Sequence, residues 1–119
     1  MAIVCGGASG IGAGCVRSLV RDGCAVVIMD LPRQEKRAQR VIASLPSGST
    51  CHFVAANAMV STEVEIAVEK ANTLVGVPAP DVVVVGLVCY AMLCLALERG
   101  GGRDGLDRLD FCRVVMETR

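Results

Sequence analysis

Short apolar runs alternate along most of the chain with longer segments in which apolar residues recur at helical spacing. The runs at 2–4, 24–29, 51–55 and 81–85 are too short for helices and are rich in β-branched residues. Runs of this kind are typical of buried strands. The pattern therefore predicts four strands separated by helical segments.

Three helices are predicted between these strands. The first runs from about residue 10 to 21, with a predicted buried face of Ile11, Cys15, Val16, Leu19 and Val20. The second begins near Pro32, and its apolar residues follow the spacing i, i+3, i+4 and i+7 at Ala38, Val41, Ile42 and Leu45. The third starts at Ser61, the predicted N-cap, and should bury Val64, Ala67, Val68, Ala71, Leu74 and Val75.

This alternation of strands and helices indicates an α/β fold. Strands joined through helices pair in parallel with right-handed crossovers, so we expect a parallel sheet with flanking helices and the strand order 3-2-1-4. The last strand contains four consecutive valines at 82–85. A continuous β-branched run of this kind fits a strand that is covered on both faces.

A glycine-rich stretch connects the first strand to the first helix. Its glycines, Gly6, Gly10 and Gly12, have the spacing G-x-x-x-G-x-G. In such a connection one glycine permits the tight turn, one lets the backbone approach a pyrophosphate, and one lets the helix pack closely on its strand. Backbone N–H groups and a helix N-terminus then face the phosphates. The stretch predicts a dinucleotide-binding turn.

Asp30 supports the same interpretation. It ends the second predicted strand, about twenty residues beyond the glycines, where a carboxylate accepts hydrogen bonds from an adenosine ribose. A carboxylate there repels a 2′-phosphate, which favours NAD over NADP as the cofactor. The alternative is an aspartate that only caps the turn before Pro32. The glycine spacing favours the cofactor interpretation.

These residues carry a family resemblance. Gly-Gly-Ala-Ser-Gly-Ile-Gly at 6–12, followed by Val-Val-Ile-Met-Asp-Leu-Pro at 26–32, resembles the start of a short-chain dehydrogenase/reductase, and most of all the 3-hydroxyacyl-CoA (17β-hydroxysteroid) dehydrogenase branch. The resemblance covers about residues 3–84 and returns faintly at 109–115. It implies a Rossmann-like sheet and hydride transfer between NAD and a hydroxyl or carbonyl substrate. It divides the chain into an NAD-binding half, 1–86, and a divergent segment, 87–119.

The resemblance also implies roles for individual residues. Ser9 and Ile11 would contact the pyrophosphate through backbone or hydroxyl groups, beside Gly6, Gly10 and Gly12. Asn57 and Ala58 would flank the adenine, at positions where the family usually has Asp-Val. Asn57 keeps the hydrogen-bonding capacity of the acid and loses its charge.

Three departures from the family separate this chain from a complete enzyme. Cys5 replaces the usual threonine of the first turn, and Val-Gly-Leu-Val at 85–88 replaces Asn-Asn-Ala-Gly, so that Leu87 threatens a steric conflict with the nucleotide. The catalytic Tyr-x-x-x-Lys is missing, because the only tyrosine, Tyr90, is followed four residues later by Cys94. We therefore predict no catalytic residues and an enzyme half that is truncated relative to the family. The alternatives are a non-catalytic nucleotide-binding or protein-interaction module and a truncated product.

Composition limits the classes of binding partner, metal site and cellular location that we expect. Twelve basic and twelve acidic residues balance, which argues against nucleic acid as a partner. A local basic cluster, Arg33, Lys36, Arg37 and Arg40, has the pattern of a solvated helix face. The seven cysteines contain no C-x-x-C pair and His52 is the only histidine, so no metal site is expected. Reduced cysteines favour an intracellular, cytoplasmic location, with mitochondria as the alternative that the resembling branch suggests.

The apolar stretch at 82–97 raises the question of a membrane. Its sixteen residues fall short of the roughly 20 that a helix needs to cross a bilayer, and Glu98 and Arg99 end it. We expect a buried strand followed by a buried helix, with a last helix near 106–116. The fourth strand should be the edge of the sheet, which predicts self-association or a partner chain through that strand.

Overall fold

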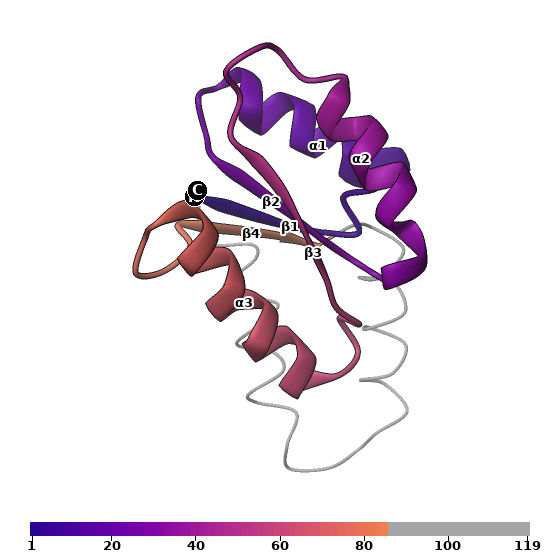
Figure 1. Cartoon of the computed structure of the whole chain (residues 1–119), viewed down its shortest axis with the longest axis vertical. Helices are drawn as coiled ribbons and strands as arrows, with labels where there is room; N and C mark the ends of the chain where they lie inside the picture. The colour runs from indigo at the N-terminus through magenta and orange to yellow at the C-terminus, as the bar shows by residue number, and fades with distance from the viewer. Residues whose placement is uncertain (86–119) are drawn as a thin grey trace.

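In a computed structural model of the chain, the described part comprises residues 1–85 (Figure 1). Its strands and helices follow in the order β1 (Ala2–Cys5), α1 (Gly10–Arg21), β2 (Val26–Asp30), the short 3-10 helix η1 (Pro32–Gln34), α2 (Glu35–Ala43), β3 (Cys51–Ala55), α3 (Ser61–Val75) and β4 (Val82–Val85). The predicted alternation of strands and helices is confirmed. The segment 87–119 lies outside the described residues, and with it Leu87, Tyr90 and the helix expected near 106–116. Most of the apolar stretch at 82–97, for which a membrane helix was the alternative, lies outside them too.

The four strands form one parallel sheet with the order β3-β2-β1-β4, as predicted. β1 lies inside the sheet, with Ala2 opposite Val26 on one side and opposite Val82 on the other. The ammonium group of Met1 lies 2.6 Å from the Asp81 carboxylate, where β1 and β4 begin. This hydrogen-bonded ammonium lowers the pKa of Asp81.

Helices cover both faces of the sheet. Figure 1 shows α1 and α2 on one face and α3 on the other. Because successive side chains of a strand point to opposite faces, the core has two parts. Val4, Val26 and Ile28 pack beneath α1 and α2, whereas Ile3, Val27 and Met29 pack beneath α3. β1 and β2 are thus covered by helices on both faces of the sheet.

The buried face of α1 differs from the prediction at its start. Ile11 is 62% exposed, and the buried residues of this helix are Gly12, Ala13 and Val16. Two small residues in the first turn let α1 approach the sheet closely, and the periodicity of large apolar residues does not reveal such a contact. Ile11 therefore lies outside the core.

Two details of the other helices were also predicted incorrectly. Leu74 of α3 is 50% exposed, while Ala67 and Ala71 form its buried contact with the sheet. Ser61 is the first residue of α3 and Val60 is its N-cap, with no side-chain capping bond. The acid of the first turn, Glu63, reaches back instead to the N–H of Asn57, at 2.7 Å from its Oε2.

Candidate functional site

Three connections that contain the predicted site residues meet at one edge of the sheet. The glycine-rich turn follows β1, Asp30 ends β2, and Asn57 follows β3. Because the strands are parallel, all three lie at the carboxyl edge. Helices on opposite faces follow β1 and β3, the arrangement in which open α/β sheets bind ligands beyond their strand ends.

The glycine-rich turn needs glycine at three positions for two different reasons. Gly6 and Gly10 have φ angles of 74° and 56°, in the left-handed region that other residues rarely adopt. Gly12 lies in α1, where a Cβ would stand 2.0 Å from the carbonyl oxygen of Gly6. The turn and the helix thus touch through their backbones, and no side chain fits between them.

Gly7 is a further constrained position that the sequence pattern did not single out. A Cβ on Gly7 would lie 3.1 Å from both the Cγ2 atom of Ile28 and the carbonyl oxygen of Val4. This spacing is tighter than ordinary van der Waals contact. The second glycine of the pair at 6–7 is the only feature of the sequence that could have indicated it.

The N-terminus of α1 lacks the groups that usually satisfy a helix start. Ser9 is its N-cap and has extended backbone angles, but its side chain makes no capping bond. The first turn holds no acidic residue, whereas α2 has Glu35 and α3 has Glu63. Ser9, Gly10 and Ile11 are exposed. Free N–H groups and the positive end of the helix dipole therefore face solvent, as an anion site requires.

Asp30 links the end of β2 to the glycine-rich turn. Its Oδ2 accepts a hydrogen bond from the N–H of Ala8 at 3.2 Å, and its Oδ1 accepts one from the N–H of Leu31 at 2.8 Å. The carboxylate is partly buried beside the turn. Each oxygen retains a further lone pair, because an ionised carboxylate has about four acceptor sites. Asp30 can therefore hold the turn and still accept hydroxyl donors.

The loop after β3 is ordered by its own hydrogen bonds. The Oδ1 atom of Asn57 accepts from the N–H of Met59 at 3.0 Å, and the carbonyl oxygen of Asn57 accepts from the N–H of Val60 at 3.0 Å. Glu63 binds the N–H of Asn57, as described above. Asn57 is thus a turn residue whose side-chain oxygen is engaged, and the neighbouring Ala58 is exposed. The role of Glu63 was not predicted, because it needs the loop geometry.

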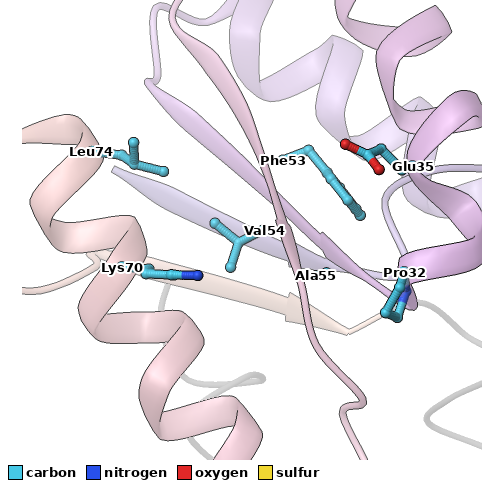
Figure 2. Close-up of a pocket in the computed structure, with 7 residues that line it drawn as sticks. All are labelled: Pro32, Glu35, Phe53, Val54, Ala55, Lys70 and Leu74. Atoms are coloured by element: carbon cyan, nitrogen blue, oxygen red, sulfur yellow. The ribbon is translucent and has the colours of Figure 1, made fainter.

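A pocket of about 330 Å³ lies along β3 and reaches the carboxyl end of this strand at Ala55. The structure shows it lined by Pro32, Glu35, Phe53, Val54, Ala55, Lys70 and Leu74 (Figure 2). Within residues 1–85, no group of three or more His, Cys, Asp or Glu side chains is arranged to hold a metal ion. None of the helices in this range is long and apolar enough to cross a bilayer.

Comparison with known proteins agrees with this geometry. Residues 1–85 match the sequence model of the family described as short chain dehydrogenase. The apo form of LigD from Sphingobium sp. strain SYK-6 is similar, with a TM-score of 0.61 and 25% identity over 69% of this chain and 34% of that one. So is 3-hydroxyacyl-CoA dehydrogenase type-2 from Mycobacterium avium, with a TM-score of 0.54 and 35% identity over 71% of this chain and 31% of that one. No curated protein matches the chain.

The match covers only part of these proteins. This chain spans about a third of the length of the two solved structures. The family model covers the sheet and helices described above. The resemblance inferred from the sequence and the strand order are thereby confirmed.

Proposed function

Because this chain belongs to the short-chain dehydrogenase family, we propose that it binds NAD at the carboxyl edge of its sheet. The observation that carries the proposal is the uncapped start of α1 beside the Asp30 carboxylate. The first supplies N–H donors for a pyrophosphate, and the second supplies acceptors for ribose hydroxyls. One dinucleotide would use both at once.

The residues that would hold the cofactor fall into three groups. Gly6, Ser9, Gly10, Ile11 and Gly12 would face the pyrophosphate. Asp30 would accept the adenosine ribose hydroxyls, and its negative charge supports NAD in preference to NADP. Asn57 and Ala58 would flank the adenine. Since the Oδ1 of Asn57 already accepts from Met59, its amide NH₂ is the group we assign to the base.

The bound cofactor would supply hydride acceptance or donation, and this chain would supply binding and orientation. The family reaction we propose by descent is hydride transfer with a hydroxyl or carbonyl substrate such as a 3-hydroxyacyl-CoA or a hydroxysteroid. In this sequence Cys94 stands four residues after Tyr90, where the family has lysine. The Tyr-x-x-x-Lys pair that moves the proton in the family is therefore not present. We propose that the chain by itself has no dehydrogenase turnover.

The same departure favours a second candidate. A chain that keeps the turn, the helix start and Asp30 but lacks the proton-transfer pair could act as a non-catalytic nucleotide-binding or interaction module. Neither candidate has turnover in this chain alone. They differ in whether the chain serves a hydride-transfer reaction or only binding. A truncated product without activity would have the same chemistry as the second candidate.

Calorimetric titration of the purified chain with NAD and NADP tests the proposal. We expect NAD to bind more tightly than NADP, and Gly12→Asp to abolish binding because its side chain would occupy the contact with Gly6. Equal or tighter binding of NADP would refute the assignment of Asp30. Reproducible NADH formation from a 3-hydroxyacyl-CoA, lost in Gly12→Asp, would refute the absence of turnover.

A further inference from the structure

β3 presents an open row of backbone groups on the side away from β2. Val26 donates its N–H to the carbonyl oxygen of Thr50, and Ala56 donates its N–H to that of Asp30. In a parallel pair every second residue of a strand bonds to the same neighbour. Because Thr50 and Ala56 bond to β2, the residues that alternate with them face away from β2. Cys51, Phe53 and Ala55 therefore direct their N–H and C=O groups outward. Within residues 1–85, β3 has β2 as its one neighbour.

The pocket of about 330 Å³ follows this open edge. Its lining comes from β3 and from the helices on both faces of the sheet. Figure 2 shows Phe53 on the side of β3 that faces Glu35, and Lys70 extending from α3 on the other side. The pocket thus straddles the strand edge, which is where the side chains of an added strand would lie.

The α3 side of this edge carries exposed apolar side chains. Ile66, Lys70 and Leu74 are spaced by four residues, so they share one face of α3. Ile66 is 59% exposed and Leu74 is 50% exposed, and both Lys70 and Leu74 line the pocket. Exposed apolar side chains beside an open strand edge are a feature of interaction surfaces.

Opposite charges stand on the two sides of the pocket. Glu35 lies on the α2 side and Lys70 on the α3 side. The ion pair found within residues 1–85 joins Met1 to Asp81, so neither pocket charge is neutralised by a salt bridge there. Successive side chains of an extended segment point to opposite faces. An acidic residue followed by a basic one would therefore meet both charges.

We propose that the open edge of β3 binds an extended segment of a partner protein as an added strand. The segment has an acidic side chain directed at Lys70 and basic neighbours directed at Glu35. Its backbone bonds to Cys51, Phe53 and Ala55, and apolar side chains at its ends cover Ile66 and Leu74. Strand addition of this kind takes affinity from main-chain bonds and specificity from alternate side chains.

A second copy of this chain is a poorer occupant of the same edge. Two copies of β3 paired antiparallel about a two-fold axis would form one continuous sheet, with like faces on the same side. Lys70 would then share one face with its own copy, and Glu35 would share the other face with its own copy. Like charges on one face oppose the pairing.

The probe for this proposal is an end-capped pentapeptide, Val-Lys-Glu-Lys-Val, titrated into the isotope-labelled full chain. Its face pattern is the same in either strand direction. We expect the amide resonances of Cys51, Phe53 and Ala55 to shift on titration. The charge-inverted peptide Val-Glu-Lys-Glu-Val should bind about threefold to tenfold more weakly, as expected for two exposed ion pairs.

Two further measurements separate strand addition from general charge attraction. In the double variant Glu35→Lys/Lys70→Glu, whose changed residues are both exposed, the preference between the two peptides should reverse. Two methylated probes test the backbone N–H donors that strand addition requires. One is methylated on the backbone nitrogens of its second and fourth residues, and the other on those of its first, third and fifth residues. One of these two should lose binding.

The proposal fails if the two peptides bind equally, or if the double variant leaves the preference unchanged. It also fails if both methylated probes bind as tightly as the parent. Concentration-dependent shifts of the same amides without peptide would identify a second copy as the occupant and would overturn it as well. A cooperative thermal transition of the double variant would show that a lost preference between the peptides is not caused by unfolding.

Discussion

The Oδ2 atom of Asp30 and the N–H of Ala8 form a hydrogen bond of 3.2 Å that joins the end of β2 to the glycine-rich turn. The residue expected to hold the ribose thus also positions the backbone expected to hold the pyrophosphate. Its second oxygen is bonded to the N–H of Leu31 at 2.8 Å. The conformation of the turn therefore depends on Asp30 before any nucleotide arrives.

Replacement of Asp30 should separate its two contributions. In Asp30→Ala, the amide of Ala8 should exchange with solvent faster in the nucleotide-free chain, and NAD binding should weaken by roughly 1–3 kcal/mol because acceptors for the turn and the ribose are lost. Asp30→Asn keeps an oxygen acceptor and removes the charge. It should protect Ala8 less than the parent chain does, because one oxygen cannot accept from both Ala8 and Leu31, and it should gain affinity for NADP relative to NAD. Unchanged exchange of Ala8 in Asp30→Ala would contradict the coupling.

Alanine at two glycines of α1 should have opposite effects on stability. In Gly12→Ala the added Cβ would lie 2.0 Å from the Gly6 oxygen, so the turn must move, and we expect a loss of about 1–3 kcal/mol. In Gly14→Ala nothing lies within 4 Å of the new Cβ, and helix propensity should add about 0.5–1 kcal/mol. Chemical denaturation measures both. Similar values for the two variants would show that the contact between turn and helix is not rigid.

Glu63→Ala should loosen the loop before α3. The variant loses the bond from Glu63 to the N–H of Asn57, a contact similar to a helix cap, and should lose about 1 kcal/mol of stability. Glu65→Ala, at an exposed position of the same turn, serves as the control for the loss of an acidic side chain. If Asn57 flanks the adenine, Glu63→Ala should also weaken NAD binding more than Glu65→Ala does. Equal effects would remove the positioning role of Glu63.

The pH dependence of stability should include a contribution from Cys51. Burial raises the pKa of this thiol from 9.0 to about 11. The folded chain therefore keeps its proton where the unfolded chain loses it, so this contribution is complete below pH 9 and disappears as the pH rises to about 11. Denaturation at several pH values should show a smaller fall across this range in Cys51→Ala than in the parent chain. Parallel curves would contradict the assignment.

Self-association through β4 is a further expectation. Within residues 1–85, β4 pairs with β1 on one side, and its sequence has four valines without proline or charge. Such an edge favours pairing with another strand. Light scattering over a concentration series should detect a dimer or a larger species. A monodisperse monomer with a cooperative thermal transition would show that the edge is covered within the chain.

Periodicity predicted the elements well where large apolar residues make the contacts. The bounds of α1 and β3 and the strand order were predicted correctly. Ile11 and Leu74 were placed in the core incorrectly, because the close contacts of their helices use small residues, Gly12 and Ala13 in one and Ala67 and Ala71 in the other. Hydrophobic spacing does not register contacts of this kind.

The sequence indicated candidate residues for the site, but it did not indicate the hydrogen bonds that these residues make. The positive φ angles of Gly6 and Gly10 follow from the turn that glycine allows. The bond from Ala8 to Asp30 joins residues 22 positions apart, and that from Asn57 to Glu63 depends on the path of a loop. Both require the pairing of strands to be known first. The pocket along β3 likewise combines residues from η1, α2, β3 and α3, and Pro32 and Leu74 are far apart in sequence.

The place of β1 inside the sheet has a consequence for how the protein is made. Of the described strands, β1 is made before β2 and β3, and all three are complete by Ala55, so they can pair early. The second neighbour of β1 is β4, which begins at Val82. Until then one side of β1 is open in the growing chain, and unpaired strand edges in folding intermediates are prone to aggregation. The interval between the pairing of β1 with β2 and the synthesis of β4 is therefore when a chaperone would contribute most to the yield.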